Sequence, residues 1–239
     1  MIPSGEELAD LFASGRLERI GIGSRRACFR VPGGAYCVKG YRSEEEIALG
    51  RHVGLVPGKS KPLGAAVVRE IRRCRFSDRG NTSCQEWRYY EALRRRLPAE
   101  LMAVFPGTLE RVLVPGRGWC LVEEMVLNAD GTPVQNLFKV FRGTADPARR
   151  AALLRALDDL QAQLERHAVR FYDPQNVMVQ ELADGGFRLR VVDFEPASRT
   201  LLAVDRLGAW VVRLKVRRRF RRFRRIFHLD VPAAAEGGR

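Results

Sequence analysis

The chain has 239 residues, 46% of them hydrophobic, which is enough to bury a sizeable core in one or two domains. Its net charge of +14 comes mainly from arginine, and its five cysteines, which include no Cys-x-x-Cys pair, argue against a disulfide framework and a zinc site. The start is acidic where a signal peptide is basic, and no apolar run reaches the roughly 18 residues of a membrane span, so we expect a cytoplasmic protein.

The N-terminal segment predicts a helix followed by three strands. Residues 5–14 have apolar side chains at helical spacing, which indicates a short amphipathic helix. Residues 16–41 read as three strands, with a first turn at Gly-Ile-Gly-Ser (21–24) and a second at Pro-Gly-Gly (32–34). The third strand ends in Lys39, which is notable because the chain has only five lysines.

The first turn and the lysine together resemble the nucleotide-binding start of a protein kinase. A glycine turn lets backbone N–H groups approach phosphate oxygens closely. The resemblance implies that Gly21, Gly23 and Ser24 contact phosphates and that Lys39 holds the α- and β-phosphates of ATP. Arg26 stands where the kinase loop has its third glycine. A plain β-meander is the alternative interpretation of the same residues.

Residues 43–80 predict surface-exposed loops of an insertion, because glycine, proline and arginine recur there. A helix is expected over 83–97, ending before Pro98. Its Glu86 is the candidate for the helix glutamate that pairs with the kinase lysine.

Two alternatives remain open for this pairing. Ser83 and Glu86 have the spacing of a capping box, which needs no active site. Glu46 and Glu70 are the other glutamates that could pair with Lys39.

Two further strands are expected around residues 111–114 and 119–126, followed by a turn at Asn-Ala-Asp-Gly (128–131). By its order in the chain, the second strand corresponds to the kinase hinge, whose backbone binds adenine. The resemblance therefore places Glu123 and Met125 in the nucleotide site.

Asp146 and Pro147 mark the start of a long helix that ends near His167. Leucines at helical spacing form one face, which predicts a core stripe made of Leu153, Leu157, Leu160 and Leu164. His167 lies in the last turn, where it favours the helix dipole, and we interpret it as structural.

A β-hairpin is predicted next, with strands at 177–181 and 187–192 around an Ala-Asp-Gly-Gly turn. Folding the hairpin about the Asp-Gly pair would place Asn176 opposite Asp193, with Asp173 three residues upstream of Asn176. Amide and carboxylate oxygens are ligands that suit Mg²⁺. The alternative is that Asn176 and Asp193 cap a surface hairpin.

This loop and hairpin resemble the catalytic heart of protein kinases. Asp193-Phe194-Glu195 corresponds to the kinase Asp-Phe-Gly and Asn176 to the metal-binding Asn of the catalytic loop. Phe171 stands at the position of the catalytic Asp, so Asp173 is the remaining loop carboxylate that could assist an attacking hydroxyl.

The motifs LVEEM, DGTPVQNL, YDPQNVMV and VVDFEPA together resemble the YrbL family of bacterial proteins of the PhoP regulatory network, a divergent kinase-like group. The resemblance implies an α+β, two-lobed kinase-like fold, with a small β-rich N-lobe over 1–127 and a mainly helical C-lobe over 128–239. It implies binding of ATP and Mg²⁺ and phosphate transfer to a hydroxyl of a sugar, a glycolipid or a protein. The alternative is a pseudokinase acting as a regulatory or scaffold module.

The segment 213–225 holds nine basic residues and no acid, with Val212, Val216, Phe220, Phe223 and Phe227 at helical spacing. A basic amphipathic helix of this kind is typical of proteins on an anionic membrane surface, here the inner membrane. The alternative is a C-terminal helix that packs its aromatic face on the C-lobe. A nucleic-acid partner is favoured only by charge.

Overall fold

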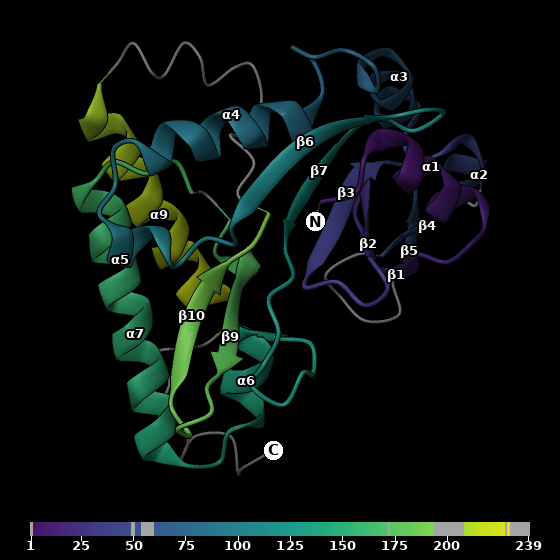
Figure 1. Ribbon diagram of the computed structural model, residues 1–239. Coiled ribbons are helices and arrows are strands. Elements are labelled where there is room, and N and C mark those ends of the chain that lie inside the picture. Colours follow the sequence, from purple (N-terminus) through teal and green to yellow (C-terminus); the bar gives the residue numbers. More distant parts are fainter. Residues whose placement is uncertain are drawn as a thin grey trace. The chain divides into compact units, whose positions relative to one another are not determined.

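The computed structural model describes residues 2–48, 51–53, 60–171, 173–193, 208–227 and 229. The chain divides into two compact units, each described by itself: Met1–Ala92 with Gly107–Met125, and Leu93–Pro106 with Val126–Arg239. Both units combine helices with antiparallel strands (Figure 1), which confirms a mixed α+β chain. Residues 93–106, which we expected in the N-terminal domain, group with the second unit.

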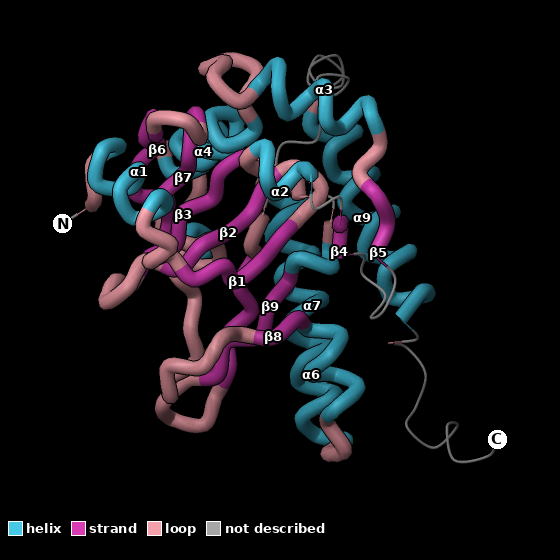
Figure 2. Tube along the Cα trace, turned by 90° about the vertical axis from the view of Figure 1, so that its right-hand side faces the viewer, coloured by secondary structure: helices cyan, strands magenta, loops and turns pink. Residues whose placement is uncertain are grey.

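The first unit is built on a five-stranded antiparallel sheet in the order β1-β2-β3-β7-β6, whose neighbouring strands can be followed in Figure 2. The strands expected from the sequence are present. They are β1 (Glu18–Ile22), β2 (Arg26–Arg30), β3 (Tyr36–Tyr41), β6 (Thr108–Val114) and β7 (Gly118–Glu124).

Helix α1 (Gly5–Ala13) packs on one face of this sheet. It begins with a capping box in which the Ser4 side chain accepts from the Glu7 N–H and the Glu7 carboxylate accepts from the Ser4 N–H. The apolar core on this face contains Leu8, Val31, Val38, Val114, Cys120 and Val122. Because side chains alternate along a strand, Lys39 lies on the opposite face of the sheet from Val38.

The segment 43–80 is more regular than the surface loops that we expected. It contains α2 (Glu44–Ala48), α3 (Ala65–Cys74) and the strands β4 (Arg51–Val53) and β5 (Ser60–Pro62). In α3 the apolar residues Ile71 and Cys74 are buried against Tyr41 of β3 and Ile47 of α2. The expectation of loops was wrong for α3, because Val67, Val68, Ile71 and Cys74 recur at the spacing of one helix face between the arginines, a periodic signal that the composition of the segment does not reveal. Residues 49–50 and 54–59 of the segment lie outside the described part of the chain.

The second unit contains a three-stranded antiparallel sheet in the order β10-β9-β8. Its strands are β8 (Gln135–Asn136), β9 (Val177–Glu181) and β10 (Phe187–Val191). Its helical segments are α5 (Ala99–Met102), α6 (Leu137–Gly143), α7 (Pro147–Arg166), the short 3₁₀ helix η1 (Pro174–Asn176) and α9 (Ala209–Phe227).

Helix α7 follows the sequence prediction closely. The Asp146 carboxylate accepts from the N–H groups of Ala148 and Arg149, and Pro147 is the first helical residue. The four predicted leucines are all buried. His167 is the C-cap residue, consistent with the structural role that we expected.

Helix α9 packs its aromatic face on the second unit, mainly against α7. Val212, Val216, Phe220 and Phe223 are buried, and the ring of Phe220 meets that of Phe171 edge to face at 6.2 Å. This confirms the interpretation of the aromatic stripe as core. None of the described helices combines sufficient length with sufficient hydropathy to cross a lipid bilayer.

Candidate functional site

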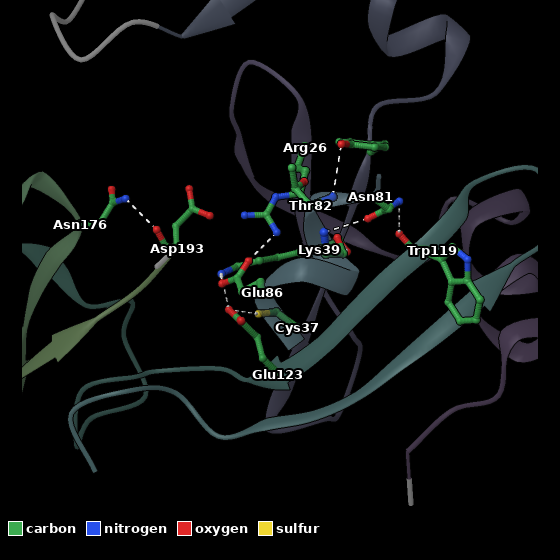
Figure 3. Close-up of polar contacts among 12 residues, drawn as sticks. Arg26, Cys37, Lys39, Asn81, Thr82, Glu86, Trp119, Glu123, Asn176 and Asp193 are labelled. Carbon is green, nitrogen blue, oxygen red and sulfur yellow. Dashed lines mark hydrogen bonds and ion pairs between the residues drawn. The ribbon is translucent and has the colours of Figure 1, made fainter. Parts of the chain in front are cut away.

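Four charged side chains meet inside the first unit, and we call them the buried charge cluster: Arg26, Lys39, Glu86 and Glu123 (Figure 3). The Lys39 Nζ lies 2.7 Å from Glu123 Oε1 and 3.6 Å from Glu86 Oε1. The second oxygen of Glu86 accepts from Arg26 Nη1 at 2.5 Å. Each of the four residues is at most 8% exposed, so their charges act on one another with little screening by water.

The strand register explains why three of these side chains share one face of the sheet. Arg26 lies opposite Tyr41, and Glu123 lies opposite Cys37. Since Cys37, Lys39 and Tyr41 alternate along β3, all three point to the same side, and Arg26 and Glu123 point there as well.

Helix α4 (Thr82–Arg94) supplies the fourth residue, Glu86. The Asn81 side chain accepts from the Ser83 N–H and donates to the carbonyls of Arg75 and Trp119, which anchors the start of the helix. The Ser83 hydroxyl donates to the Lys39 carbonyl at 3.4 Å. These bonds attach the first turn of α4 to the sheet and bring Glu86 to Lys39.

The predicted ion pair between Lys39 and Glu86 is therefore present. The capping-box alternative at Ser83 was wrong, because Asn81 caps α4 and the Glu86 carboxylate binds Arg26 and Lys39.

The two other candidate partners of Lys39 are engaged elsewhere. Glu46 forms a capping box with Ser43 and an ion pair with Arg117 at 2.8 Å. Glu70 pairs with Arg25 at 3.0 Å. Sequence reasoning missed the roles of Arg26 and Glu123 in the cluster. Side chains alternate between the two faces of a strand, so pairing β2 and β7 with β3 in the observed register would have placed Arg26 and Glu123 on the face of Lys39.

Burial sets the protonation of this cluster. Burial raises the pKa of Glu123, Lys39 opposes that shift, and Glu86 adds to it. The Cys37 thiol, 3.8 Å from the Glu123 carboxylate, has its pKa raised by a hydrogen bond with Cys28 and by burial, so it stays neutral. With two cations and two carboxylates, the cluster has no net charge when all four groups are ionised.

The glycine turn differs from the expected one. Gly21 is paired within β1 opposite Cys28, so it is a strand residue and not part of the turn. The Gly23 N–H donates to the Arg26 carbonyl at 2.8 Å, and the Gly23 carbonyl accepts from the Arg42 guanidinium. The chain turns at Gly23 and Ser24, two residues later than predicted, because β1 extends to Ile22.

The predicted hinge is also arranged differently. The Met125 N–H donates to the Ala35 carbonyl at 2.9 Å, and the Glu124 N–H donates to the Gly107 carbonyl at 2.7 Å. These two N–H donors are thus occupied inside the unit, and the expected place of Met125 in a nucleotide site stays a prediction. The Glu123 side chain forms an ion pair with Lys39, and its expected position in a hinge stays a prediction.

In the second unit, the predicted hairpin β9–β10 is confirmed, but its register is shifted by one residue. Val177 pairs with Val191, and the Val192 N–H donates to the Asn176 carbonyl, so Asn176 lies opposite Val192 and not Asp193. The cause is the turn. The Leu182 N–H donates to the Gly186 carbonyl, so residues 183–185 form the loop. This is a three-residue loop, and its last residue, Gly185, has the left-handed φ of +79° that such loops require.

Because of this register shift, Asn176 contacts the backbone of Asp193 and is not directly opposite it. The Asn176 side-chain amide donates to the backbone carbonyl of Asp193 at 3.2 Å (Figure 3), and the Asp193 carboxylate takes no part in this bond. Asp193 is exposed and has φ +52°, a conformation that Asp tolerates better than most residues. Phe194 and Glu195 lie outside the described residues.

Asp173 caps η1 by accepting from the Gln175 N–H. Its pKa lies above the ordinary value because neighbouring protein removes part of its hydration; the Gln175 bond opposes the shift, and the Asp193 carboxylate adds repulsion. Phe171, which the kinase resemblance aligned with the catalytic Asp, is 1% exposed and packs in the core. A phenylalanine in the core cannot accept a proton, so no base operates from this position.

The residues of this loop fit a hard cation. Asn176 donates through its amide nitrogen to the Asp193 carbonyl, so its amide oxygen takes no part in that bond, and the carboxylates of Asp173 and Asp193 lie near enough to repel each other. A divalent cation held by an amide oxygen and one or two carboxylates is the arrangement that Mg²⁺ prefers. Among the described residues, no three His, Cys, Asp or Glu side chains gather into a metal site, so remaining ligands would come from substrate or water.

No known family model matches the chain, and no curated protein matches it at a significant level.

Proposed function

We propose that the protein is a kinase-like nucleotide-binding protein, of the type that its YrbL-like motifs imply, with ATP and Mg²⁺ as its ligands. The observation that carries this proposal is the buried pair of Lys39 and Glu86. A strand lysine oriented by a helix glutamate is the device with which kinases bind nucleotide phosphates.

Each unit contributes its own residues to this function. In the first unit, Lys39 binds the α- and β-phosphates, Glu86 orients Lys39, and the turn at Gly23 and Ser24 supplies backbone groups. In the second unit, Asn176 and Asp193 hold Mg²⁺. When bound, the cation supplies positive charge that neutralises the phosphate oxygens.

Asp173 is the residue that we assign to the acceptor hydroxyl. Its raised pKa brings the carboxyl group closer to neutral pH, where a general base is most effective. Positioning and electrostatic stabilisation account for most of phosphoryl transfer, so Phe171 in the place of the usual base lowers the rate and does not by itself abolish it. The acceptor is a hydroxyl of a sugar, a glycolipid or a protein.

Nucleotide binding is tested by thermal unfolding with ATP, with and without Mg²⁺. A ligand that binds only the native state at 100 times its Kd stabilises it by about 2.7 kcal/mol, which raises Tm measurably. Asp193→Asn, at an exposed residue, should remove the Mg²⁺-dependent part of the shift, whereas Lys39→Met should remove most of the ATP shift. Lys139→Ala, an exposed lysine on α6, is the matched control. Unchanged Tm of the wild type at saturating ATP would refute the proposal.

A second candidate function is a pseudokinase that binds nucleotide and acts as a regulatory or scaffold module. The burial of Phe171 against Phe220 favours it, because a core side chain stands where the kinase resemblance expects the catalytic Asp that acts as the base. Turnover decides between the two. Slow ATP consumption that falls in Asp173→Asn at unchanged nucleotide affinity supports the transferase. Binding without turnover above the Lys39→Met variant, across sugar, glycolipid and protein acceptors, supports the pseudokinase.

A further inference from the structure

The outward face of α9 carries a second feature, opposite the side that packs in the core. Trp210, Leu214, Arg218, Arg222 and Arg225 are all exposed and lie on one side of the helix, at spacings of three or four residues. We call them the outer stripe. Trp210 is 65% exposed and Leu214 55%, although both are large apolar residues. The outer stripe thus begins with two apolar side chains and continues with arginines.

Among the eight arginines of α9, two groups differ in their surroundings. Those facing α7 are engaged: Arg217 binds the Glu165 carboxylate at 2.8 Å, and Arg224 binds the Asp158 carboxylate at 2.5 Å. Arg213 donates to the Glu165 carbonyl. The acids of α7 are therefore used to hold the helix in place.

The second group is the set of arginines in the outer stripe. Within the described part of the chain, Arg218, Arg222 and Arg225 make no ion pair, and α9 itself contains no acid. Their positive charge is directed away from the unit and is not compensated by the helix that carries it. Such a face is complementary to a polyanionic surface.

The apolar end of the outer stripe favours one kind of anionic partner. A phosphate backbone offers nothing to an aliphatic side chain such as Leu214. A lipid surface offers anionic headgroups to the arginines and an interfacial layer to Trp210 and Leu214. Tryptophan in particular prefers the membrane–water interface.

We propose that the outer stripe of α9 docks the protein on an anionic lipid surface, with the helix lying parallel to it. Trp210 and Leu214 insert at the headgroup level, and Arg218, Arg222 and Arg225 contact lipid phosphates. The aromatic face that the sequence suggested for a membrane is buried in the core, so the opposite face makes the contact. No residue of the outer stripe belongs to the proposed nucleotide site.

The first test is co-sedimentation of the full chain with phosphatidylcholine vesicles, with and without phosphatidylglycerol. Each arginine near an anionic surface contributes about 1 kcal/mol, so replacing all three outer-stripe arginines by serine should lower partitioning about 100-fold. The control replaces Arg95, Arg96 and Arg155 by serine. These are exposed residues of the same unit with the same total charge, and the control should bind nearly as well as the wild type.

The second test separates lipid from other polyanions. Trp210→Ser with Leu214→Ser should weaken vesicle binding and leave binding to duplex DNA unchanged. In a Trp87→Phe, Trp119→Phe background, Trp210 emission should shift to the blue on anionic vesicles. Circular dichroism of each variant checks that α9 remains folded.

Three results would overturn the proposal. The first is an equal loss of binding in the two triple-arginine variants. The second is vesicle binding that is insensitive to the Trp210 and Leu214 changes, together with tighter binding to DNA. The third is no partitioning of the wild type at low salt.

Discussion

Removing the Glu86 carboxylate tests the buried charge cluster most directly. In Glu86→Gln, Arg26 and Lys39 stay buried but lose the acid that contacts both. Glu86 is fully buried, and breaking a buried pair by removing one partner typically costs about 3–5 kcal/mol, because the remaining charge is left uncompensated. We expect a loss of that size in the free energy of unfolding of the first unit.

The matched control is Glu70→Gln. Glu70 pairs with Arg25 at 3.0 Å, but both side chains are about one-third exposed. An ion pair of this kind contributes about 1 kcal/mol or less. Both substitutions convert a carboxylate that pairs with an arginine into an amide and so remove one negative charge, and the two sites differ mainly in burial.

The assay is urea unfolding followed by tryptophan fluorescence. In a Trp210→Phe background, the reporters are Trp87 in α4 and Trp119 in β7, both in the first unit. A lower urea midpoint at unchanged slope measures the stability difference. If Glu86→Gln destabilises the unit no more than Glu70→Gln does, the cluster does not hold α4 on the sheet, and the reasoning fails.

Three further predictions concern the second unit. Phe171→Ala should lower the free energy of unfolding by about 3–5 kcal/mol, measured by urea unfolding followed by far-UV circular dichroism, because it leaves a cavity against Phe220. Asp173→Asn should be slightly more stable than the wild type near neutral pH, since the raised folded-state pKa means that the ionised carboxylate is disfavoured in the fold; the gain is small because Asp173 is exposed, and it should vanish below pH 3.8, where the carboxyl group is protonated in both states. Gly185→Ala should cost about 1–2 kcal/mol through its φ of +79°, whereas Gly143→Ala, at a position without positive φ, should not lower Tm.

The sequence alone determined the elements whose signals are local. Helix α7 follows from its Asp146-Pro147 start and its leucine spacing, and the hairpin β9–β10 follows from the Asp-Gly-Gly turn between apolar runs. The signals for such elements come from residues within a few positions of one another in the chain. They can therefore be read without knowing how distant segments pack. The buried aromatic face of α9 belongs to the same class.

The tertiary structure decided register and partners. The predicted two-residue loop would place Asn176 opposite Asp193, whereas the observed three-residue loop places it opposite Val192. Both loops contain Asp184 and Gly185, so the composition of the turn does not distinguish them. Helix α3 is a different case. Its apolar residues already have helical spacing in the sequence, and the structure adds that they pack against Tyr41 and Ile47.

The partners of Lys39 show the same limit of local signals. Glu46, Glu70 and Glu86 are equivalent in the sequence as acids that could reach a lysine. Strand pairing adds Arg26 and Glu123 to the same face, and the Asn81 anchor brings Glu86 over it. A charged side chain interacts over a few ångströms in space, whereas the two acids that pair with Lys39, Glu86 and Glu123, lie 47 and 84 residues away along the chain, so only the folded arrangement selects among them.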